Sequence, residues 1–172
     1  VRPDGTILTN AHVVRDGIEF RVTLLGGREV RATFVGRDDA TDLAVLDIEG
    51  DGWPYLELER NRPARVGEWA IAVGNPLGFS HTVTAGIVSG TGRDGLQLAT
   101  YEDFLQTDAA ITPGNSGGPL LSLEGRVLGV NTAVGLPASG ASGMGFAIPV
   151  HLADFVLERL LADGEVVRGY LG

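Results

Sequence analysis

Short strand-like runs, separated by glycine-rich turns, make up most of this chain. Residues 19–25 and 28–36 are rich in residues that favour β-strands, and Gly26-Gly27 between them is typical of a hairpin turn. Similar runs, two of them joined by a turn at Glu124-Gly125, occur at 6–9, 43–46, 69–73, 82–88, 120–123, 126–132 and 143–148. This pattern predicts an all-β fold built from short strands.

A single helix near the C-terminus is the clear exception. Apolar side chains recur with helical spacing over residues 151–162, and Asp163-Gly164 is a helix stop signal. Strands at short intervals followed by one helix indicate β-barrels or a sandwich rather than alternating β and α units. The length of 172 residues suits one globular unit or two small fused ones, with the polar stretch 60–65 as the best candidate linker.

Two residue types are absent, and their absence narrows the chemistry. The chain has no cysteine, which excludes thiol nucleophiles, disulfides and cysteine-ligated zinc. All thirteen basic residues are arginine, so Ser–Lys dyads, Schiff bases and the P-loop lysine are excluded too. Only His12, His81 and His151 can serve as histidine bases. We interpret His81 and His151 as structural, because neither has an Asp or Cys at ligand spacing, and we expect no metal and no cofactor.

The charge balance bears on possible partners. A net charge of −9 argues against a nucleic-acid partner, because neutralising phosphates needs a basic face. No apolar stretch approaches the eighteen or so residues of a membrane span. The chain opens at Val1-Arg2-Pro3-Asp4-Gly5 without a signal peptide, and we expect it to be a piece of a longer protein.

Ser116 is the candidate nucleophile, because glycines flank it in Gly114-Asn115-Ser116-Gly117-Gly118. Glycines let backbone N–H groups turn towards an oxyanion. An isolated match of this kind, however, is more often a glycine-rich hairpin that contains a serine. His12 follows one predicted strand, and Asp42 leads into another. Each alone has an ordinary structural interpretation, and Asp38, Asp39 and Asp47 compete with Asp42. Their order His…Asp…Ser, however, is that of a known catalytic triad.

The flanking residues go beyond a generic triad. Thr-Asn-Ala-His-Val-Val, Thr-Asp-Leu-Ala-Val-Leu and Gly-Asn-Ser-Gly-Gly-Pro-Leu resemble the HtrA/DegP family of trypsin-like serine proteases at all three sites. Residues 70–78, 106–111 and 145–149 resemble it as well, so the resemblance covers essentially the whole chain.

The resemblance implies a trypsin-like double β-barrel, with the first barrel lacking its N-terminal strand, followed by a C-terminal α-helix. Residues 1–60 would form the N-terminal barrel with the His and Asp. Residues 61–150 would form the C-terminal barrel with the Ser, the oxyanion loop and the specificity pocket. Residues 151–172 would hold the helix and the start of a linker to a PDZ domain, which this chain does not include.

The resemblance also implies roles for particular residues. Ser116 would attack the peptide carbonyl, His12 would take its proton, and Asp42 would orient the imidazole. The oxyanion would rest in the loop Gly114, Asn115 and Ser116, on the N–H groups of Gly114 and Ser116. The residues expected to bind substrate are Ala110 at the base of the pocket, Ile111, Val130, Asn131, Thr132, Ala133 and Val134.

These residues predict the substrate preference. Because no carboxylate lies at the base of the pocket, we expect cleavage after small or medium aliphatic residues. The strand that begins at Thr132 is the expected edge for pairing with an extended substrate. The family implies unfolded polypeptides as substrates, a role in protein quality control, and a periplasmic or cell-envelope location. It also implies a homotrimer, which stays open for this chain.

Two alternatives come from other classes. The segment around Ser116 also fits the G-x-S-x-G elbow of α/β-hydrolases, but that elbow must lead into a helix and be followed by an acid and a His. Here Pro119-Leu120-Leu121 leads into a strand, and Glu124 is the only carboxylate between Ser116 and His151. The other alternative is a catalytically silent binding module with a protease fold.

The conformation of the active-site loops is a separate question. We expect residues 92–100, 112–115 and 134–143 to be mobile, and a flip of the peptide between Pro113 and Gly114 would remove an oxyanion donor.

Overall fold

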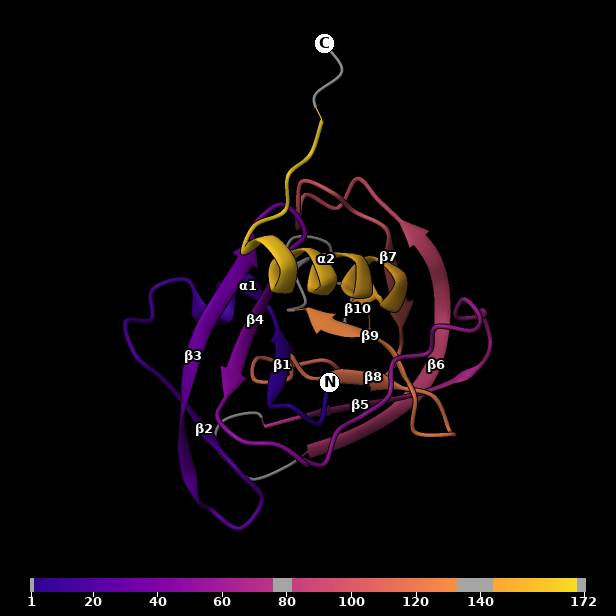
Figure 1. Ribbon diagram of the computed structural model, residues 1–172. Coiled ribbons are helices and arrows are strands. Elements are labelled where there is room, and N and C mark those ends of the chain that lie inside the picture. The colour runs from indigo at the N-terminus through magenta and orange to yellow at the C-terminus, as the bar shows by residue number, and fades with distance from the viewer. Residues whose placement is uncertain (1, 76–81, 133–143, 170–172) are drawn as a thin grey trace.

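The computed structural model describes residues 2–75, 82–132 and 144–169, and strands account for most of the regular structure (Figure 1). The first unit is a four-stranded antiparallel sheet in the order β1-β4-β3-β2. Its strands are β1 (Thr6–Thr9), β2 (Phe20–Thr23), β3 (Glu29–Asp38) and β4 (Leu43–Ile48). A bulge between Phe34 and Gly36 shifts the register of β3 against β4.

The second unit is a closed barrel of six strands in the order β10-β7-β6-β5-β8-β9. Its strands are β5 (Trp69–Gly74), β6 (Thr82–Arg93), β7 (Phe104–Thr107), β8 (Pro119–Leu121), β9 (Val127–Thr132) and β10 (Gly145–Pro149). Every residue of β9 and β10 is buried, because one face of each strand fills the barrel and the other meets the rest of the protein.

Local turn chemistry places the hairpins where the sequence predicted them. Gly26 and Gly27 both have positive φ, 96° and 85°, which glycine adopts without a Cβ clash. The backbone N–H of Leu24 donates to the carbonyl of Arg28 at 2.8 Å and closes this hairpin. The turn at Glu124-Gly125 is closed in the same way, since Ser122 N–H donates to Arg126 O at 2.9 Å.

Helix α2 (Val150–Asp163) lies against both units (Figure 1). Its inward face packs in a core cluster that also receives Leu43 and Val45 from the first sheet and Phe146 and Ile148 from the barrel. The helix is capped by Gly164, where φ is 75° and the N–H donates to Leu160 O at 3.0 Å, as the predicted stop signal requires. The buried apolar side chains of the helix are Val150, Ala153, Val156, Leu157 and Leu160.

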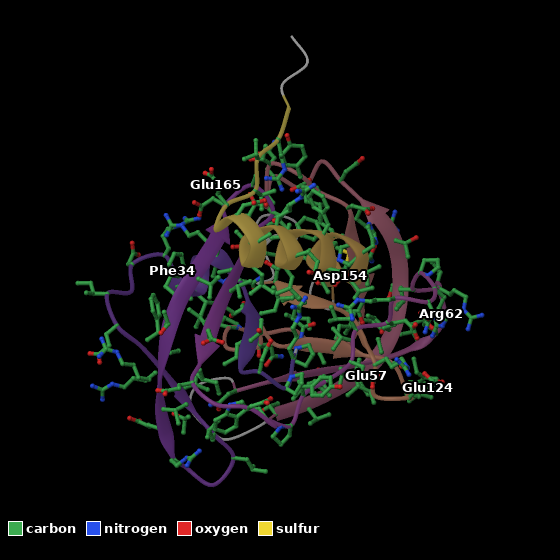
Figure 2. The ribbon with its side chains drawn as sticks, viewed as in Figure 1. Phe34, Glu57, Arg62, Glu124, Asp154 and Glu165 are labelled. Atoms are coloured by element: carbon green, nitrogen blue, oxygen red, sulfur yellow. The ribbon has the colours of Figure 1, made fainter. Side chains whose placement is uncertain are left out.

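The segment between the two units is tied to the same helix. The guanidinium of Arg60 donates to both carboxylate oxygens of Asp154, at 2.6 and 3.0 Å. Figure 2 shows Asp154 on α2, above the barrel. A bidentate contact of this kind fixes orientation as well as distance.

The structure confirms the predicted fold class: mostly strands, a closed barrel and a C-terminal helix. Two elements were not predicted, the four-residue helix α1 (Ala11–Val14) and the four-residue strand β7. Strand β6 extends to Arg93 and so includes the start of the predicted loop 92–100. Within the described parts of the chain, no helix combines the length and the apolar character needed to cross a membrane.

Candidate active site

His12 and Asp42 meet at the edge of the first sheet where β1 ends and β4 begins. His12 lies in the short helix α1, directly after β1, and Asp42 ends the turn that joins β3 to β4. The Nδ1 atom of His12 lies 2.8 Å from Asp42 Oδ2, and the backbone N–H of His12 donates to Asp42 Oδ1 at 2.9 Å. Both carboxylate oxygens therefore contact one residue, which fixes the plane of the carboxylate relative to the imidazole.

Asp42 has a left-handed backbone conformation, with φ of 59°. Few residues other than glycine adopt it, and Asp is one of the better tolerated. Two donors hold its carbonyl oxygen: the side-chain amide of Asn10 at 3.0 Å and the backbone N–H of Ala11 at 3.1 Å. The side chain of Asn10 is fully buried. The residues just before His12 thus hold the backbone of Asp42.

A third contact comes from the barrel. The hydroxyl of Thr132, the last residue of β9, donates to Asp42 Oδ2 at 3.1 Å. The sequence interpretation placed Thr132 in a substrate pocket and did not anticipate this bond. Thr132 and Asp42 lie 90 residues apart, and no local pattern links them.

The loop that carries Ser116 is fastened to the same strand. Gly117 N–H donates to Asn131 O at 2.9 Å, and Asn131 N–H donates to Gly118 O at 2.8 Å. Gly117 also approaches β1 so closely that an added Cβ would lie 2.2 Å from Thr9 Oγ1. The structure therefore brings Ser116 into the same region as His12 and Asp42. Among the described residues, no hydrogen bond joins the Ser116 hydroxyl to the His12 imidazole.

The turn before Ser116 has one defined peptide orientation. Asn115 N–H donates to Thr112 O at 2.9 Å, and Gly114 has φ of 103°. Pro followed by a residue with positive φ is the pattern of a type II turn, which differs from type I by a flip of the central peptide. Within the described residues, the N–H groups of Gly114 and Ser116 have no hydrogen-bond acceptor, whereas the N–H of Asn115 is used inside the turn.

The predicted pocket residues fall in different places. Ala110 is exposed, and its carbonyl accepts hydrogen bonds from Thr84 Oγ1 at 2.8 Å and from the side-chain amide of Asn115 at 3.2 Å. Ile111 is buried in the barrel core, whereas Val130 belongs to the cluster under α2. Ala133 and Val134, the predicted loop 134–143 and His81 lie outside the described residues.

The sequence of the chain also matches a known protein family over most of its length. Residues 1–130 match the family described as the trypsin-like peptidase domain. The chain belongs to this family. The match includes His12, Asp42 and Ser116 and ends inside β9.

Curated relatives extend the likeness over the whole of this chain. The probable periplasmic serine endoprotease DegP-like of Chlamydia pneumoniae is 51% identical over 172 residues, which cover all of this chain and 35% of the relative. The protein of the same description from Hahella chejuensis is 49% identical and is covered to 36%. The chain thus spans about a third of the length of these relatives.

Solved structures agree. The HtrA-type protease AlgW, solved with a decapeptide, superposes with a TM-score of 0.94 and 48% identity over all of this chain and 53% of its own. The serine endoprotease from Yersinia pestis superposes with a TM-score of 0.89 and 44% identity, with 59% of that chain covered. The predicted resemblance to HtrA/DegP proteases is therefore confirmed.

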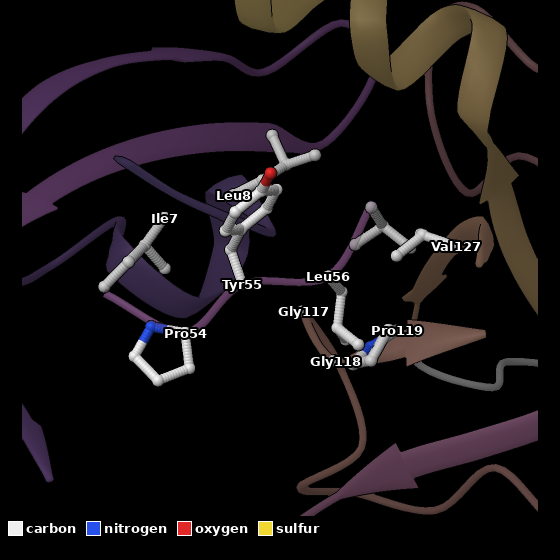
Figure 3. A pocket seen from close by; sticks show the side chains of 10 residues that line it. Ile7, Leu8, Pro54, Tyr55, Leu56, Gly117, Gly118, Pro119 and Val127 are labelled. Atoms are coloured by element: carbon white, nitrogen blue, oxygen red, sulfur yellow. The ribbon is translucent and has the colours of Figure 1, made fainter. Parts of the chain in front are cut away.

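Two cavities adjoin the residues of the candidate site, His12 and Asp42 on one side and the Ser116 loop on the other. One, of about 260 Å³, is lined by His12, Arg15, Asp39, Asp42, Leu98 and Thr132. The other, of about 370 Å³, lies between the two units on the side of Gly117 and Gly118, and Tyr55 and Leu56 also line it (Figure 3). Its lining is largely apolar, and Ile7 and Leu8 of β1 contribute to it.

His151 has a partner that its sequence neighbours did not indicate. Its Nε2 atom lies 2.9 Å from Asp103 Oδ2, at the exposed start of α2. The two residues are 48 positions apart, so spacing in the sequence does not indicate this pair. Across the described segments, no group of three or more His, Asp or Glu side chains is arranged to hold a metal ion.

Proposed function

We propose that the chain is the catalytic domain of a serine endopeptidase in which Ser116, His12 and Asp42 form the triad. The contact of 2.8 Å between His12 Nδ1 and Asp42 Oδ2 carries this proposal. It leaves Nε2 as the nitrogen that can accept a proton, because a carboxylate partner keeps the proton on Nδ1. The fastening of the Ser116 loop to β9 and β1 supports it further.

The reaction follows from these positions. Ser116 Oγ attacks the carbonyl carbon of the scissile bond while His12 Nε2 takes the hydroxyl proton. His12 then donates that proton to the leaving amine as the C–N bond breaks. Water, deprotonated by the same nitrogen, hydrolyses the acyl-enzyme and regenerates Ser116. The absence of a hydrogen bond from Ser116 to His12 in the described residues is compatible with this role, because such bonds often tighten only when substrate binds.

The N–H groups of Gly114 and Ser116 are the proposed oxyanion donors. Their lack of an acceptor among the described residues, together with the positive φ of Gly114, supports this assignment. The N–H of Asn115 already bonds Thr112 O, so Asn115 contributes its place in the loop rather than a donor. Losing one oxyanion donor typically costs about 3–4 kcal/mol of transition-state stabilisation.

The substrate preference is proposed on the residues that the sequence predicts at the base of the substrate pocket. Ala110 and Ile111 present no charge, so a small or medium aliphatic side chain is the expected occupant. Discrimination within an apolar pocket is worth only about 1–3 kcal/mol per methylene, so broad tolerance is expected.

The biological setting is proposed from the relatives. Because curated relatives are described as periplasmic DegP-like endoproteases, we propose a cell-envelope location and unfolded polypeptides as substrates in quality control. A C-terminal PDZ domain and a trimer are proposed for the full-length protein on the same basis. The division at residues 60 and 150 into two barrel units and a helical tail is also a proposal.

Cleavage of a fluorogenic peptide with valine before the scissile bond tests the activity. Ser116→Ala should abolish cleavage, whereas Ser89→Ala, a change of the same size on β6, should leave it intact. A fluorophosphonate should add covalently to wild type and to Ser89→Ala but not to Ser116→Ala, as read by intact mass. Equal cleavage and equal labelling of all three proteins would overturn the triad. Absence of both from all three would favour a catalytically silent binding module.

A further inference from the structure

An ion pair to a buried carboxylate lies behind the turn that carries Asp42. The guanidinium of Arg168 donates to Asp38 Oδ1 at 2.7 Å and to Oδ2 at 2.6 Å. Asp38 is only 7% exposed, and the two residues are 130 positions apart. A bidentate contact to a buried carboxylate restrains both distance and orientation.

Arg168 reaches Asp38 from the segment that follows α2. This segment starts at Gly164, which packs against β3: a Cβ added at Gly36 would lie 2.5 Å from Gly164 O. Arg168 also stacks over the ring of Tyr101, with its central carbon 4.6 Å from the ring centroid. Residues 164–169, which we call the strap, therefore contact the last residues of β3 at two points, Gly36 and Asp38.

Asp38 begins the turn whose last residue is Asp42. It accepts a hydrogen bond of 2.5 Å from the hydroxyl of Thr41, which is 1% exposed, and its carbonyl accepts one of 3.3 Å from Thr41 N–H. The carbonyl of Ala40, in the middle of the turn, accepts a bond of 2.8 Å from Tyr101 N–H. Arg168 and Tyr101 thus hold the turn from outside while Asp38 and Thr41 close it from within.

This turn places Asp42, in its left-handed conformation, within hydrogen-bond distance of His12. A single non-glycine residue at positive φ is strained and persists only when its surroundings determine it. Asn10 and Ala11 donate hydrogen bonds to the carbonyl of Asp42. The ion pair of Asp38 with Arg168 holds the other end of the same turn. Burial opposes ionisation of Asp38, but the bonds from Arg168 and Thr41 outweigh it and hold the pKa of Asp38 below its usual value.

We propose that Arg168 is a positioning residue for the proposed active site, acting through Asp38 and the turn 38–42 on the contact between Asp42 and His12. This inference rests on the proposed triad. It assigns to the strap a task in catalysis although the strap touches none of the three triad residues in the described structure. The same contacts would have been invisible in the sequence, where Arg168 is one arginine among thirteen.

The test combines kinetics with NMR of the His12 Nδ1 proton, which needs no turnover. Four variants are compared with wild type: Arg168→Gln, Arg168→Lys, the double variant Asp38→Asn with Arg168→Gln, and the control Arg159→Gln. Arg159 is a matched surface arginine on α2, 3.9 Å from Asp163. The double variant leaves no unpaired charge in the cluster, so it separates loss of positioning from loss of folding.

We expect Arg168→Gln and the double variant to lower kcat by roughly 10- to 100-fold with little change in KM, because misplacement of a catalytic group far from the mutation can cost that much. We expect their Nδ1 proton signal to broaden through exchange with water. Arg168→Lys should recover part of both, and Arg159→Gln should match wild type.

A double variant that folds and keeps both the kcat and the sharp Nδ1 signal of wild type would overturn the inference. Should wild type prove inactive on every peptide, the proposed function fails, but the NMR comparison still decides whether Arg168 positions Asp42 against His12.

Discussion

The hydroxyl of Thr132 donates a hydrogen bond of 3.1 Å to Asp42 Oδ2, the carboxylate oxygen that also faces His12 Nδ1. The other oxygen accepts the backbone N–H of His12. Three hydrogen bonds therefore hold one carboxylate, and one of them comes from the opposite unit. The carboxylate that orients the proposed base is therefore held by the barrel as well as by the first unit.

Removing the Thr132 hydroxyl should therefore weaken catalysis more than folding. For Thr132→Val, which keeps the shape of the side chain, we expect kcat/KM to fall about tenfold, since a hydrogen bond to a charged group is worth roughly 1.5–3 kcal/mol. Thr132→Ser retains the hydroxyl and should stay within about threefold of wild type. Steady-state kinetics on the fluorogenic peptide measure both. A valine variant as active as the serine variant would contradict this role.

Asn10 should prove necessary for the conformation of Asp42. Asn10→Ala removes the buried donor to Asp42 O, and leaving that carbonyl with fewer partners should cost about 1–3 kcal/mol of unfolding free energy. Cleavage should fall as well, because the left-handed conformation loses a restraint. Urea unfolding and peptide cleavage give the two numbers. Asn61→Ala, at an exposed asparagine, serves as control, and an equal effect there would argue against a specific role.

Gly117 should tolerate no side chain. An alanine there would place its Cβ 2.2 Å from Thr9 Oγ1 and would also occupy a backbone with φ of 81°. Gly125→Ala is a close control, because Gly125 has φ of 75° and open space around it. We expect Gly117→Ala to lose cleavage and fluorophosphonate labelling, while Gly125→Ala loses only about 1 kcal/mol of stability. Retained labelling in Gly117→Ala would show that the loop can dock without this close approach.

The Asp38–Arg168 pair should appear in the pH dependence of stability. Because the pKa of Asp38 is lower in the folded state than in the unfolded chain, its ionised form contributes stability at neutral pH. That contribution is complete above about pH 4, the ordinary pKa of an aspartate, and is lost as the pH falls through the lower folded value.

The difference in unfolding free energy between wild type and Asp38→Asn should therefore be constant from pH 7 to about pH 5 and should shrink at lower pH. Urea unfolding at stepped pH measures it. Asp163→Asn, at an exposed carboxylate, should show a small difference throughout. A difference for Asp38→Asn that grew on acidification would contradict the direction of the pKa shift.

Local chemistry explains which parts of the fold could be predicted. The hairpins at Gly26-Gly27 and Glu124-Gly125 and the helix end at Gly164 depend on backbone conformations that their own residues favour. Strand β7 was missed because Phe104–Thr107 is short and becomes a strand by pairing with β6 and β10. Tertiary pairing, rather than propensity, defines it.

The same distinction between local and tertiary determinants applies to the proposed site. Motif order in the sequence selected His12, Asp42 and Ser116, and the structure places the first two in direct contact. The residues that hold them could not be selected in this way. Thr132 and Arg168 act across 90 and 130 positions, where neither periodicity nor spacing gives a signal.

Those separations have a consequence for the order in which the protein becomes competent. A chain that has emerged from the ribosome only as far as β8 has its His12, Asp42 and Ser116 but neither the strand that fastens the serine loop nor the hydroxyl that orients the aspartate. Contacts of such long range form late, because the closure entropy of the intervening chain must first be overcome. A nascent copy therefore holds every reacting group without an assembled site, and should not cut its neighbours or itself before folding is complete.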